Sequence, residues 1–207
     1  MATDTLVRER ERLYKASAGK LEIVHVPEMS FVMIDGHGDP NTSRDYKDAI
    51  EALYALSYTL KFALQKDQGI QFRVSPLEGM WWAEDIAVFG TGRKEDWNWT
   101  MMIAQPDAVT PEWFKLAREQ VRTKKHLPAI DKARFERFKE GACAQVLHVG
   151  PFSAEGPTIE RLHAFIHEQG FSFDGMHQRH HEIYLGDPRR TAPERWKTII
   201  RQPVSIG

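Results

Sequence analysis

The chain of 207 residues carries a formal net charge of -1, with 42% hydrophobic and 28% charged residues. This is the composition of a globular protein with a proper core, and the near-neutral charge gives no reason to expect a nucleic acid as partner. A single cysteine, Cys143, excludes an internal disulfide and suits a reducing compartment, while no apolar run approaches the roughly 18 residues of a membrane span.

The first residues, "MATDTLVRERERLYK", mix charges of both signs. They contain no apolar core of the kind that a secretory signal needs. We therefore expect a cytoplasmic protein that has no membrane partner.

The first half of the chain predicts short strands around one long helix. From Ser43 to about Lys66, apolar side chains recur at helical spacing, which indicates an amphipathic helix. Just before it, "GHGDPN" lacks the glycine spacing of a phosphate-binding loop, so we predict a turn there. Strands of this half are predicted near 21–27, 31–37, 72–84 and 97–105.

The second half begins with a connecting helix. A Thr110-Pro111 pair predicts its start, because Thr is a good N-cap and Pro suits the first helical position, and the helix should continue to about Lys125. Its basic end, "RTKKHLP", is predicted to be a solvated terminus and linker. The later elements are predicted as strands near 144–151, 178–186 and 196–203, with a helix at 153–168 that ends at Gly170.

Two segments almost a hundred residues apart share one pattern. "WTMMIAQP" (99–106) and "WKTIIRQP" (196–203) both run from Trp through an aliphatic pair to Gln-Pro. Upstream of them, "PLEGMWWAED" (76–85) aligns without gaps on "RHHEIYLGDP" (179–188). The pattern predicts a duplicated unit of strand, helix, strand and strand.

We therefore predict an α+β fold made of two such units, with antiparallel sheets, helices on one face and a ligand groove on the other. All of it is expected to form a single domain of residues 1–207. The expected boundaries are about 20–107 for the first repeat, about 110–125 for the connecting helix and about 142–207 for the second repeat.

The segment "HHEIYL" alternates polar and apolar side chains, which places Glu182 and Tyr184 on the same face of a strand. Burying an unpaired carboxylate under a helix costs several kcal/mol, so we expect both side chains to face away from the helix. The ungapped alignment gives Trp81 the same direction and sends its neighbour Trp82 to the core.

The tryptophans predict an aromatic groove. Trp81 and Trp82 cannot fill the same core, because adjacent side chains of a strand point to opposite faces. For Trp99 two interpretations stay open: its alternation with Met101 suits a core position, whereas Trp97 and Trp99 together could extend an aromatic wall. An aromatic groove with one carboxylate suits a flat aromatic or cationic small molecule.

At the segments "PLEGMWW", "WTMMIAQP" and "HEIYLGDP…WKTIIRQPV", the chain resembles the GyrI-like small-molecule-binding domain family. The resemblance runs from about Gly19 to the C-terminus. With its paired tryptophans, the chain is most similar to the subfamily of cyclopropanoid cyclopropyl hydrolases. This resemblance implies an aromatic cage that opens the cyclopropane ring of DNA-alkylating toxins such as yatakemycin, and so a role in detoxification or self-protection.

On this interpretation, Glu182 and Tyr184 are the candidate catalytic residues. The carboxylate would orient or deprotonate a water, and the tyrosine hydroxyl would hydrogen-bond that water or a developing oxyanion. The candidate substrate-binding residues are Trp81, Trp99, His148 and His180.

His180 and Glu182 also invite a metal interpretation. Leu185 stands where a zinc-binding helix motif needs its second His, and the segment is a predicted strand without an evident third ligand. We therefore expect no metal and no cofactor. The structural alternative for Glu182 is a surface carboxylate paired with Arg179 or Arg189.

Two other functions stay open. One is a non-catalytic, multidrug-type ligand-binding or sensor domain, although no helix-turn-helix or basic recognition helix is evident for a stand-alone regulator. The other is a gyrase-inhibitor-like protein that acts through protein contacts, for which the sequence has no dedicated feature. In each case we expect a monomer.

Overall fold

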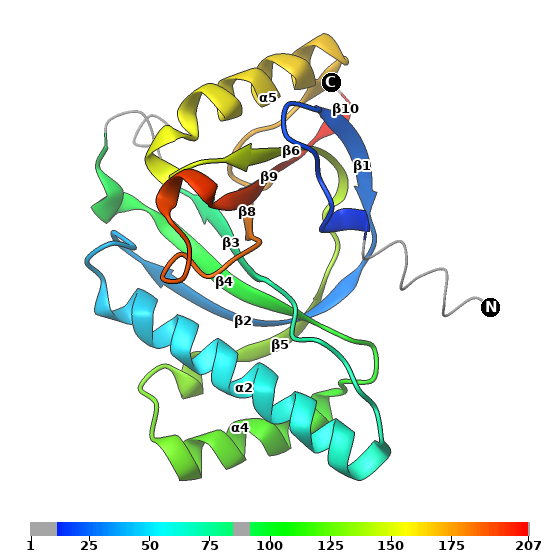
Figure 1. Ribbon diagram of the computed structural model, residues 1–207, viewed down its shortest axis with the longest axis vertical. Helices are drawn as coiled ribbons and strands as arrows, with labels where there is room; N and C mark the ends of the chain where they lie inside the picture. The colour runs from blue at the N-terminus through cyan, green and yellow to red at the C-terminus, as the bar shows by residue number, and fades with distance from the viewer. Residues whose placement is uncertain (1–11, 85–91, 207) are drawn as a thin grey trace, which may run out of the picture. The chain divides into compact units, whose positions relative to one another are not determined.

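The computed structural model describes residues 12–84 and 92–206 of the chain (Figure 1). The expectation for the N-terminus falls largely on residues 1–11, outside these ranges. The internal contacts divide the chain into two compact units. We call residues 28–138 the central unit, and residues 1–27 with 139–207 the terminal unit, because the latter contains both ends of the chain.

The central unit is a four-stranded antiparallel sheet with helices on one face. Its elements are β2 (Met29–His37), α2 (Arg44–Gln68), β3 (Leu77–Trp82), β4 (Asn98–Gln105), α4 (Pro111–Lys125) and β5 (Arg134–Phe138). Within this unit the strands lie in the order β3-β4-β2-β5. Helix α2 packs on β2 and β4, and α4 lies beside α2 (Figure 1).

Helix α2 confirms the long helix expected in the first half. Ser43 Oγ accepts a hydrogen bond from the backbone N–H of Tyr46 at 3.2 Å and so caps the first turn. Gly69 follows the last turn in the left-handed conformation, with φ of 69°, and ends the helix. The side chains that α2 buries are small or aliphatic: Ala49, Ala52, Leu53, Ala55, Leu56, Ser57, Leu60 and Leu64.

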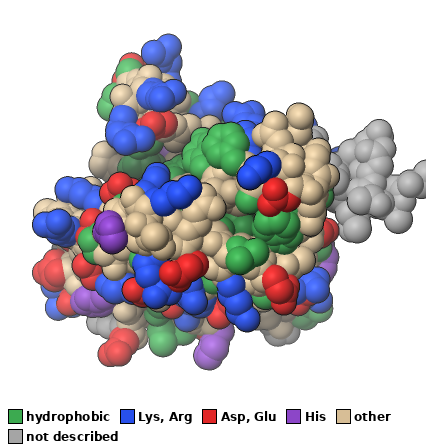
Figure 2. Space-filling model, turned by 90° about the horizontal axis from the view of Figure 1, so that it is seen from below, with side chains coloured by type: hydrophobic (Ala, Val, Ile, Leu, Met, Phe, Trp, Pro, Cys, Tyr) green, Lys and Arg blue, Asp and Glu red, His purple; other side chains and the backbone are tan. Residues whose placement is uncertain are grey.

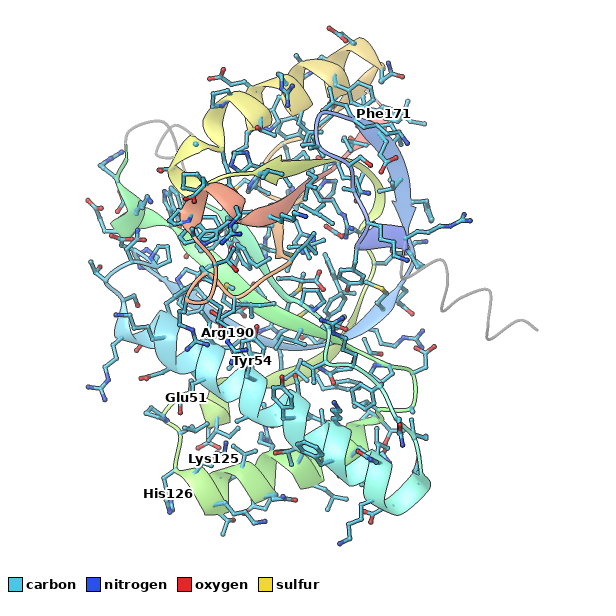
Figure 3. The ribbon with its side chains drawn as sticks, in the orientation of Figure 1. Glu51, Tyr54, Lys125, His126, Phe171 and Arg190 are labelled. Carbon is cyan, nitrogen blue, oxygen red and sulfur yellow. The ribbon has the colours of Figure 1, made fainter. Side chains whose placement is uncertain are left out.

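Helix α4 confirms the connecting helix. Thr110 Oγ1 accepts a hydrogen bond from the backbone N–H of Trp113 at 3.4 Å, as its N-cap position predicts. The last helical residue is Lys125, and His126 beyond it takes a positive φ of 50° (Figure 3). Such a φ is uncommon for a residue other than glycine, and it turns the chain out of the helix.

The terminal unit contributes four longer antiparallel strands, two short strands and one helix. Its elements are β1 (Glu22–Val26), β6 (Gly141–Val149), α5 (Gly156–Glu168), β7 (Phe171–Ser172), β8 (His180–Tyr184), β9 (Lys197–Pro203) and β10 (Ser205–Ile206). The four longer strands lie in the order β1-β6-β9-β8, and β7, which begins at Phe171 (Figure 3), pairs with β10. Short 3-10 turns of the two units lie at Lys94–Asp96, Ile130–Lys132, Phe152–Ala154 and Pro193–Arg195.

Each repeat has a strand before its strand-helix-strand-strand unit; the sequence predicted the first of these strands, near 21–27, and missed the second. Segments β2-α2-β3-β4 and β6-α5-β8-β9 are the expected strand-helix-strand-strand units, and the α+β fold is confirmed. A strand precedes each of them, and these two strands are exchanged: β1 pairs with β6, whereas β5 pairs with β2. The segment "RFERF" of β5 was not predicted, because an exposed edge strand keeps charged residues and loses the apolar alternation.

Strand pairing shifts the alignment of the repeats by two residues. Trp81 lies opposite Trp99, whereas Tyr184 lies opposite Thr198. Thr198 stands two residues after Trp196, which is the counterpart of Trp99 in the repeated segments. Tyr184 and Trp81 therefore do not occupy equivalent positions, although an even shift keeps both side chains on the corresponding face of their sheets.

The predicted direction of Trp81 is wrong, because its ring lies on the face covered by α2. Tyr46 of α2 contacts the rings of Trp81 and Trp99, with 6.0 and 5.2 Å between ring centroids. Farther along the strand of Trp99, Gln105 Nε2 donates a hydrogen bond to Ser57 Oγ of α2 at 3.0 Å. The odd-numbered residues of β4 thus face the helix, and so does Trp81 opposite them.

The predicted direction of Glu182 and Tyr184 is wrong as well. Glu182 lies opposite Ile200, and Ile200 packs with Leu162 and Ile166 of α5. The prediction depended on the cost of burying an unpaired carboxylate. In the structure the carboxyl group of Glu182 has hydrogen-bond partners, so much of that cost is offset.

The surface combines charges of both signs. On the face shown in Figure 2, acidic and basic side chains are intermixed, and hydrophobic side chains reach the surface between them. None of the helices in residues 12–84 and 92–206 is long and apolar enough to cross a lipid bilayer.

Candidate active site

Three side chains of strand β8 meet on one face, because residues two apart in a strand point the same way. Tyr184 Oη donates a hydrogen bond to Glu182 Oε2 at 2.8 Å, and His180 Nε2 lies 3.2 Å from Glu182 Oε1. The side chains of His180 and Glu182 are only 18% and 15% exposed. The structure thus brings three of the predicted site residues together around one carboxyl group.

The arginines considered as partners of Glu182 make other contacts. Arg179 Nε donates to the carbonyl oxygen of Met176 at 3.4 Å. Arg189 pairs with Asp187, with 2.9 Å between Nη2 and Oδ2. Glu182 is therefore a half-buried carboxyl held by neighbours on its own strand, and the interpretation as a surface ion pair does not describe it.

A second carboxyl group, which the sequence analysis missed, lies against the first. Glu155 directly precedes α5 and is only 4% exposed. Its carboxyl group lies close to that of Glu182 and beside Thr198 of β9. Burial and, after it, the negative charge of Glu182 hold the pKa of Glu155 well above its ordinary value. In sequence, an acidic residue at a helix start indicates only a favourable helix dipole.

A pocket of about 210 Å³ opens beside this carboxyl pair. Tyr184 connects the two, because its ring lines the pocket while its hydroxyl reaches Glu182. Basic side chains, Arg195 and Lys197, also line it. The complete lining consists of Phe152, Tyr184, Leu185, Gly186, Asp187, Pro188, Thr191, Arg195, Trp196, Lys197 and Thr198.

The aromatic wall of this pocket comes from residues that were not among the candidates. The ring of Phe152 contacts Tyr184 at 5.6 Å and Trp196 at 4.9 Å between ring centroids. Trp196 Nε1 donates to the carbonyl oxygen of Thr191 at 2.8 Å, which fixes the indole at the pocket edge. The repeated Trp at the start of each last strand was the available signal, but the sequence favoured an inward-packed Trp196 over a pocket position.

His148, which was predicted to contact the substrate, contacts residues in and just before the first turn of α5. Its Nδ1 lies 3.1 Å from Thr158 Oγ1 of α5, and its Nε2 lies 3.3 Å from the carbonyl oxygen of Pro151. The residue is 6% exposed and lies opposite Thr198 in the sheet. Both ring nitrogens of His148 therefore have partners within the protein. Contact between His148 and a ligand stays a prediction.

Trp81 and Trp99 belong to the central unit, where they form part of its core. They are 5% and 1% exposed, and the ring of Trp97 contacts that of Trp81 at 5.8 Å between centroids. Gly36 lies opposite Trp99, and a Cβ at this position would overlap the indole ring. Of the two interpretations of Trp99, the core position is confirmed. The ligand contacts expected of Trp81 and Trp99 stay a prediction.

The metal interpretation finds no cluster to support it. Within residues 12–84 and 92–206, no group of three or more His, Cys, Asp or Glu side chains is placed to hold a metal ion. His180 and Glu182 contact each other directly. The chemistry that these residues offer is acid-base chemistry on a bound small molecule.

A duplicated α+β fold with an aromatic-lined pocket is that of a small-molecule-binding protein. The chain matches the family described as the GyrI-like small molecule binding domain over residues 20–205, and it belongs to this family. No curated protein matches the chain.

Solved structures extend this relation. The chain is similar to an uncharacterized conserved protein from Listeria innocua, with 42% identity, a TM-score of 0.88, and 96% of this chain and 98% of that chain covered. It is also similar to a hydrolase from Listeria innocua, with 40% identity, a TM-score of 0.83, and again 96% and 98% covered. The C-terminal domain of EcmrR, at 11% identity and a TM-score of 0.57 over 91% of this chain and 98% of that domain, shares the fold.

Proposed function

We propose that the protein hydrolyses flat electrophilic small molecules in the pocket of the terminal unit, and that its substrates are cyclopropanoid DNA-alkylating toxins. The observation that carries the proposal is the junction of an aromatic-lined pocket with the hydrogen-bonded Tyr184–Glu182 pair. Hydrolysis of such compounds would protect the cell, so the biological role is detoxification or self-protection.

The pocket suits the reactive end of a planar molecule. The rings of Phe152, Tyr184 and Trp196 supply faces and edges against which an aromatic system can pack. A volume of about 210 Å³ is smaller than the roughly 300–1,000 Å³ that encloses a whole drug-sized ligand. We therefore place only the strained ring and its fused aromatic unit in the pocket, with the rest of the molecule outside.

The reaction requires a base that takes a proton from the attacking water, and a group that accepts the electron pair of the broken C–C bond. Water attacks the CH2 carbon of the cyclopropane, a C–O bond forms, and the strained C–C bond breaks. The electron pair of that bond moves into the fused dienone and leaves a phenolate oxygen, which takes a proton from solvent. Glu182 removes the proton of the attacking water, and Tyr184 orients the carboxylate through the hydrogen bond to Oε2.

The relation to solved structures supports a reaction. One structure at 40% identity, over nearly the whole of both chains, is described as a hydrolase, without a stated substrate. The cyclopropanoid substrate itself comes from the resemblance of the paired-tryptophan segments to the cyclopropyl hydrolases. The reaction class and the substrate class are therefore tested separately below.

Incubation of the full-length protein with a cyclopropanoid alkylator, followed by mass spectrometry, tests the proposal. We expect the compound to gain the mass of one water, and the product to lose its ability to alkylate DNA. The Glu182→Gln variant serves as the matched control, because it keeps the shape of the site and removes the base. If the compound is recovered unchanged with the wild-type protein, hydrolysis of this class is refuted.

A non-catalytic ligand-binding or sensor domain is the second candidate. The description of the family as a small-molecule-binding domain favours it. In that case the alkylator would be recovered unchanged but would still raise the unfolding temperature of the protein. The same incubation, followed by a thermal melt, therefore separates the two functions.

A further inference from the structure

The carboxyl groups of Glu155 and Glu182 lie close together, next to the pocket-lining residues Tyr184 and Thr198. Glu155 stands before the first turn of α5, but its side chain does not cap that helix. It is 4% exposed and lies close to the carboxyl group of Glu182 and beside Thr198 of the sheet. Within the described residues, no donor group lies within hydrogen-bonding distance of Glu155 Oε1. Oε1 therefore lacks a contact that would stabilise a negative charge on it.

In the described ranges, the side chains around Glu155 and Glu182 include no paired Lys or Arg that would neutralise a second negative charge. On β8, His180 contacts Glu182 Oε1 and Tyr184 donates to Oε2. On β6, His148 is engaged by Thr158 and Pro151. Among the ion pairs of the described ranges, none brings a Lys or Arg to either carboxyl group.

On helix α5, the imidazole of His163 lies near His180 and is uncharged. Burial and, after it, the neighbouring His180 and His167 lower the pKa of His163 to about 4, so this imidazole is neutral at neutral pH. Two adjacent carboxyl groups in such surroundings cannot both ionise, because each charge disfavours the other and burial disfavours both.

We propose that Glu155 and Glu182 share one proton, so that Glu155 donates a hydrogen bond to Glu182 and positions its carboxylate next to Tyr184, beside the pocket. Glu155 is thus a positioning residue that acts through Glu182. This inference deepens the proposed function, because it concerns the same site and the same base.

The shared proton determines which ligands and which proton steps the site accepts. With a single negative charge, the pair suits a neutral or singly positive flat ligand and disfavours an anion. When Glu182 takes the proton of the attacking water, the pair holds two protons and is neutral. One proton then returns to solvent, and the starting state is restored without any other reactant.

Titration of the ligand-free, full-length protein tests the pair without any assumption about turnover. Carbon-13 labelling of the glutamate carboxyl groups lets NMR follow each ionisation against pH. We expect one carboxyl group that is still protonated at neutral pH, and its signal should be absent from Glu155→Gln. In Glu182→Gln the titration midpoint of Glu155 should fall by about one pH unit or more, because the negative neighbour is gone. The exposed Glu160 of α5 provides the control, since Glu160→Gln should leave this titration unchanged.

Two results would overturn the shared proton. One is complete ionisation of all carboxyl groups below neutral pH, and the other is an unchanged midpoint of Glu155 in Glu182→Gln. The protein could show the lower midpoint of Glu155 in Glu182→Gln and still not hydrolyse an alkylator. That result supports the shared proton and refutes only the proposed function.

Rates test the positioning role. Glu155→Gln still donates a hydrogen bond to Glu182, whereas Glu155→Ala does not. We expect kcat for the alkylator to be about tenfold or more lower in Glu155→Ala than in Glu155→Gln, with a smaller change in KM. Equal kcat values in the two variants would show that Glu155 does not position the base. If Glu155→Ala fails to fold, the titrations of Glu155→Gln and Glu182→Gln still decide whether the two carboxyl groups share a proton.

Discussion

At the scale of single residues, the site depends on local contacts that make a buried carboxyl group acceptable. Glu182 lies on the helix-covered face of β8 with its two oxygens bonded to Tyr184 and His180. Strand alternation put these three side chains on one face, as the sequence predicted. The hydrogen bonds of Tyr184 and His180 offset the cost of burying Glu182 on this face, while Glu155 and Thr198, which lie close by, come from other elements.

The first prediction concerns the base. Glu182→Gln keeps the size and hydrogen-bonding capacity of the side chain but cannot accept the proton of water. We expect kcat for a cyclopropanoid alkylator to fall by about 10²–10⁴, while the Kd of a non-reactive planar analogue stays similar. Steady-state kinetics and calorimetric titration of the same variant measure the two quantities. Turnover at the wild-type rate would leave Glu182 with a structural role only.

The second prediction concerns the aromatic wall. Phe152→Ala removes a ring that contacts Tyr184 and Trp196, and Phe152 is already 42% exposed, so folding should be little affected. Binding of the planar analogue should weaken by about 1–3 kcal/mol through lost packing area. Calorimetry on both proteins measures the change. Phe62, which is 60% exposed on α2 of the central unit, is the matched control, and Phe62→Ala should not alter the Kd.

At the scale of elements, the repeated unit is held together by different contacts in its two copies. In the central unit, the helix covers paired aromatic rings, with Tyr46 of α2 against Trp81 and Trp99. In the terminal unit, the corresponding face carries Ile200 with Leu162 and Ile166 of α5, and next to Ile200 the acidic pair of Glu182 and Glu155. The same architecture therefore gives a packed core in one copy and a candidate active site in the other.

The third prediction tests the packing of the central unit. Gly36 lies opposite Trp99, and a Cβ at this position would overlap the indole, so Gly36→Ala forces the ring or the strand to move. We expect a loss of about 1–3 kcal/mol in the free energy of unfolding, measured by urea denaturation.

The control for this variant is Gly156→Ala at the start of α5. A Cβ on Gly156 meets nothing within 4 Å, and the position is helical. We expect no loss of stability there, and a gain of up to about 1 kcal/mol from the reduced freedom of the unfolded chain. An equal loss in both variants would mean that the indole of Trp99 can move at little cost.

At the scale of the whole molecule, both ends of the chain contribute to the terminal unit. Arg201 of β9 donates to the carbonyl oxygen of Leu13 at 2.7 Å, to Gln145 and to Glu140. His181 Nδ1 lies 2.8 Å from Glu140 Oε1, and the side chains of this buried network are at most 3% exposed. The N-terminal region is thus tied to the last long strand through one charged cluster.

The fourth prediction follows from the pKa of Glu140. Burial by itself would raise it, but the charges and hydrogen bonds of His181 and Arg201 outweigh burial and lower the pKa from its ordinary value of 4.5 to about 2. Because the folded pKa lies below the unfolded one, this group stabilises the fold fully above about pH 5. The stabilisation, about 3 kcal/mol, is lost as the pH falls toward 2.

Urea denaturation at a series of pH values measures this effect. Glu140→Gln should be less stable than the wild type at neutral pH, and its stability should change less between pH 5 and pH 2. Glu168→Gln, at an exposed position of α5, should follow the wild-type curve. Parallel curves for the wild type and Glu140→Gln would exclude Glu140 as the source of the acid sensitivity.

The sequence by itself determined the repeat, the ends of the helices and the alternation of β8. Caps such as Ser43 and Thr110 act through local hydrogen bonds, and strand alternation is a property of the backbone, so neither needs distant contacts. The tertiary structure alone decided which face α5 covers, where the edge strands β1 and β5 pair, and that Glu155 meets Glu182. The reason is physical: burial, strand exchange and the approach of two carboxyl groups all depend on residues far apart in the chain.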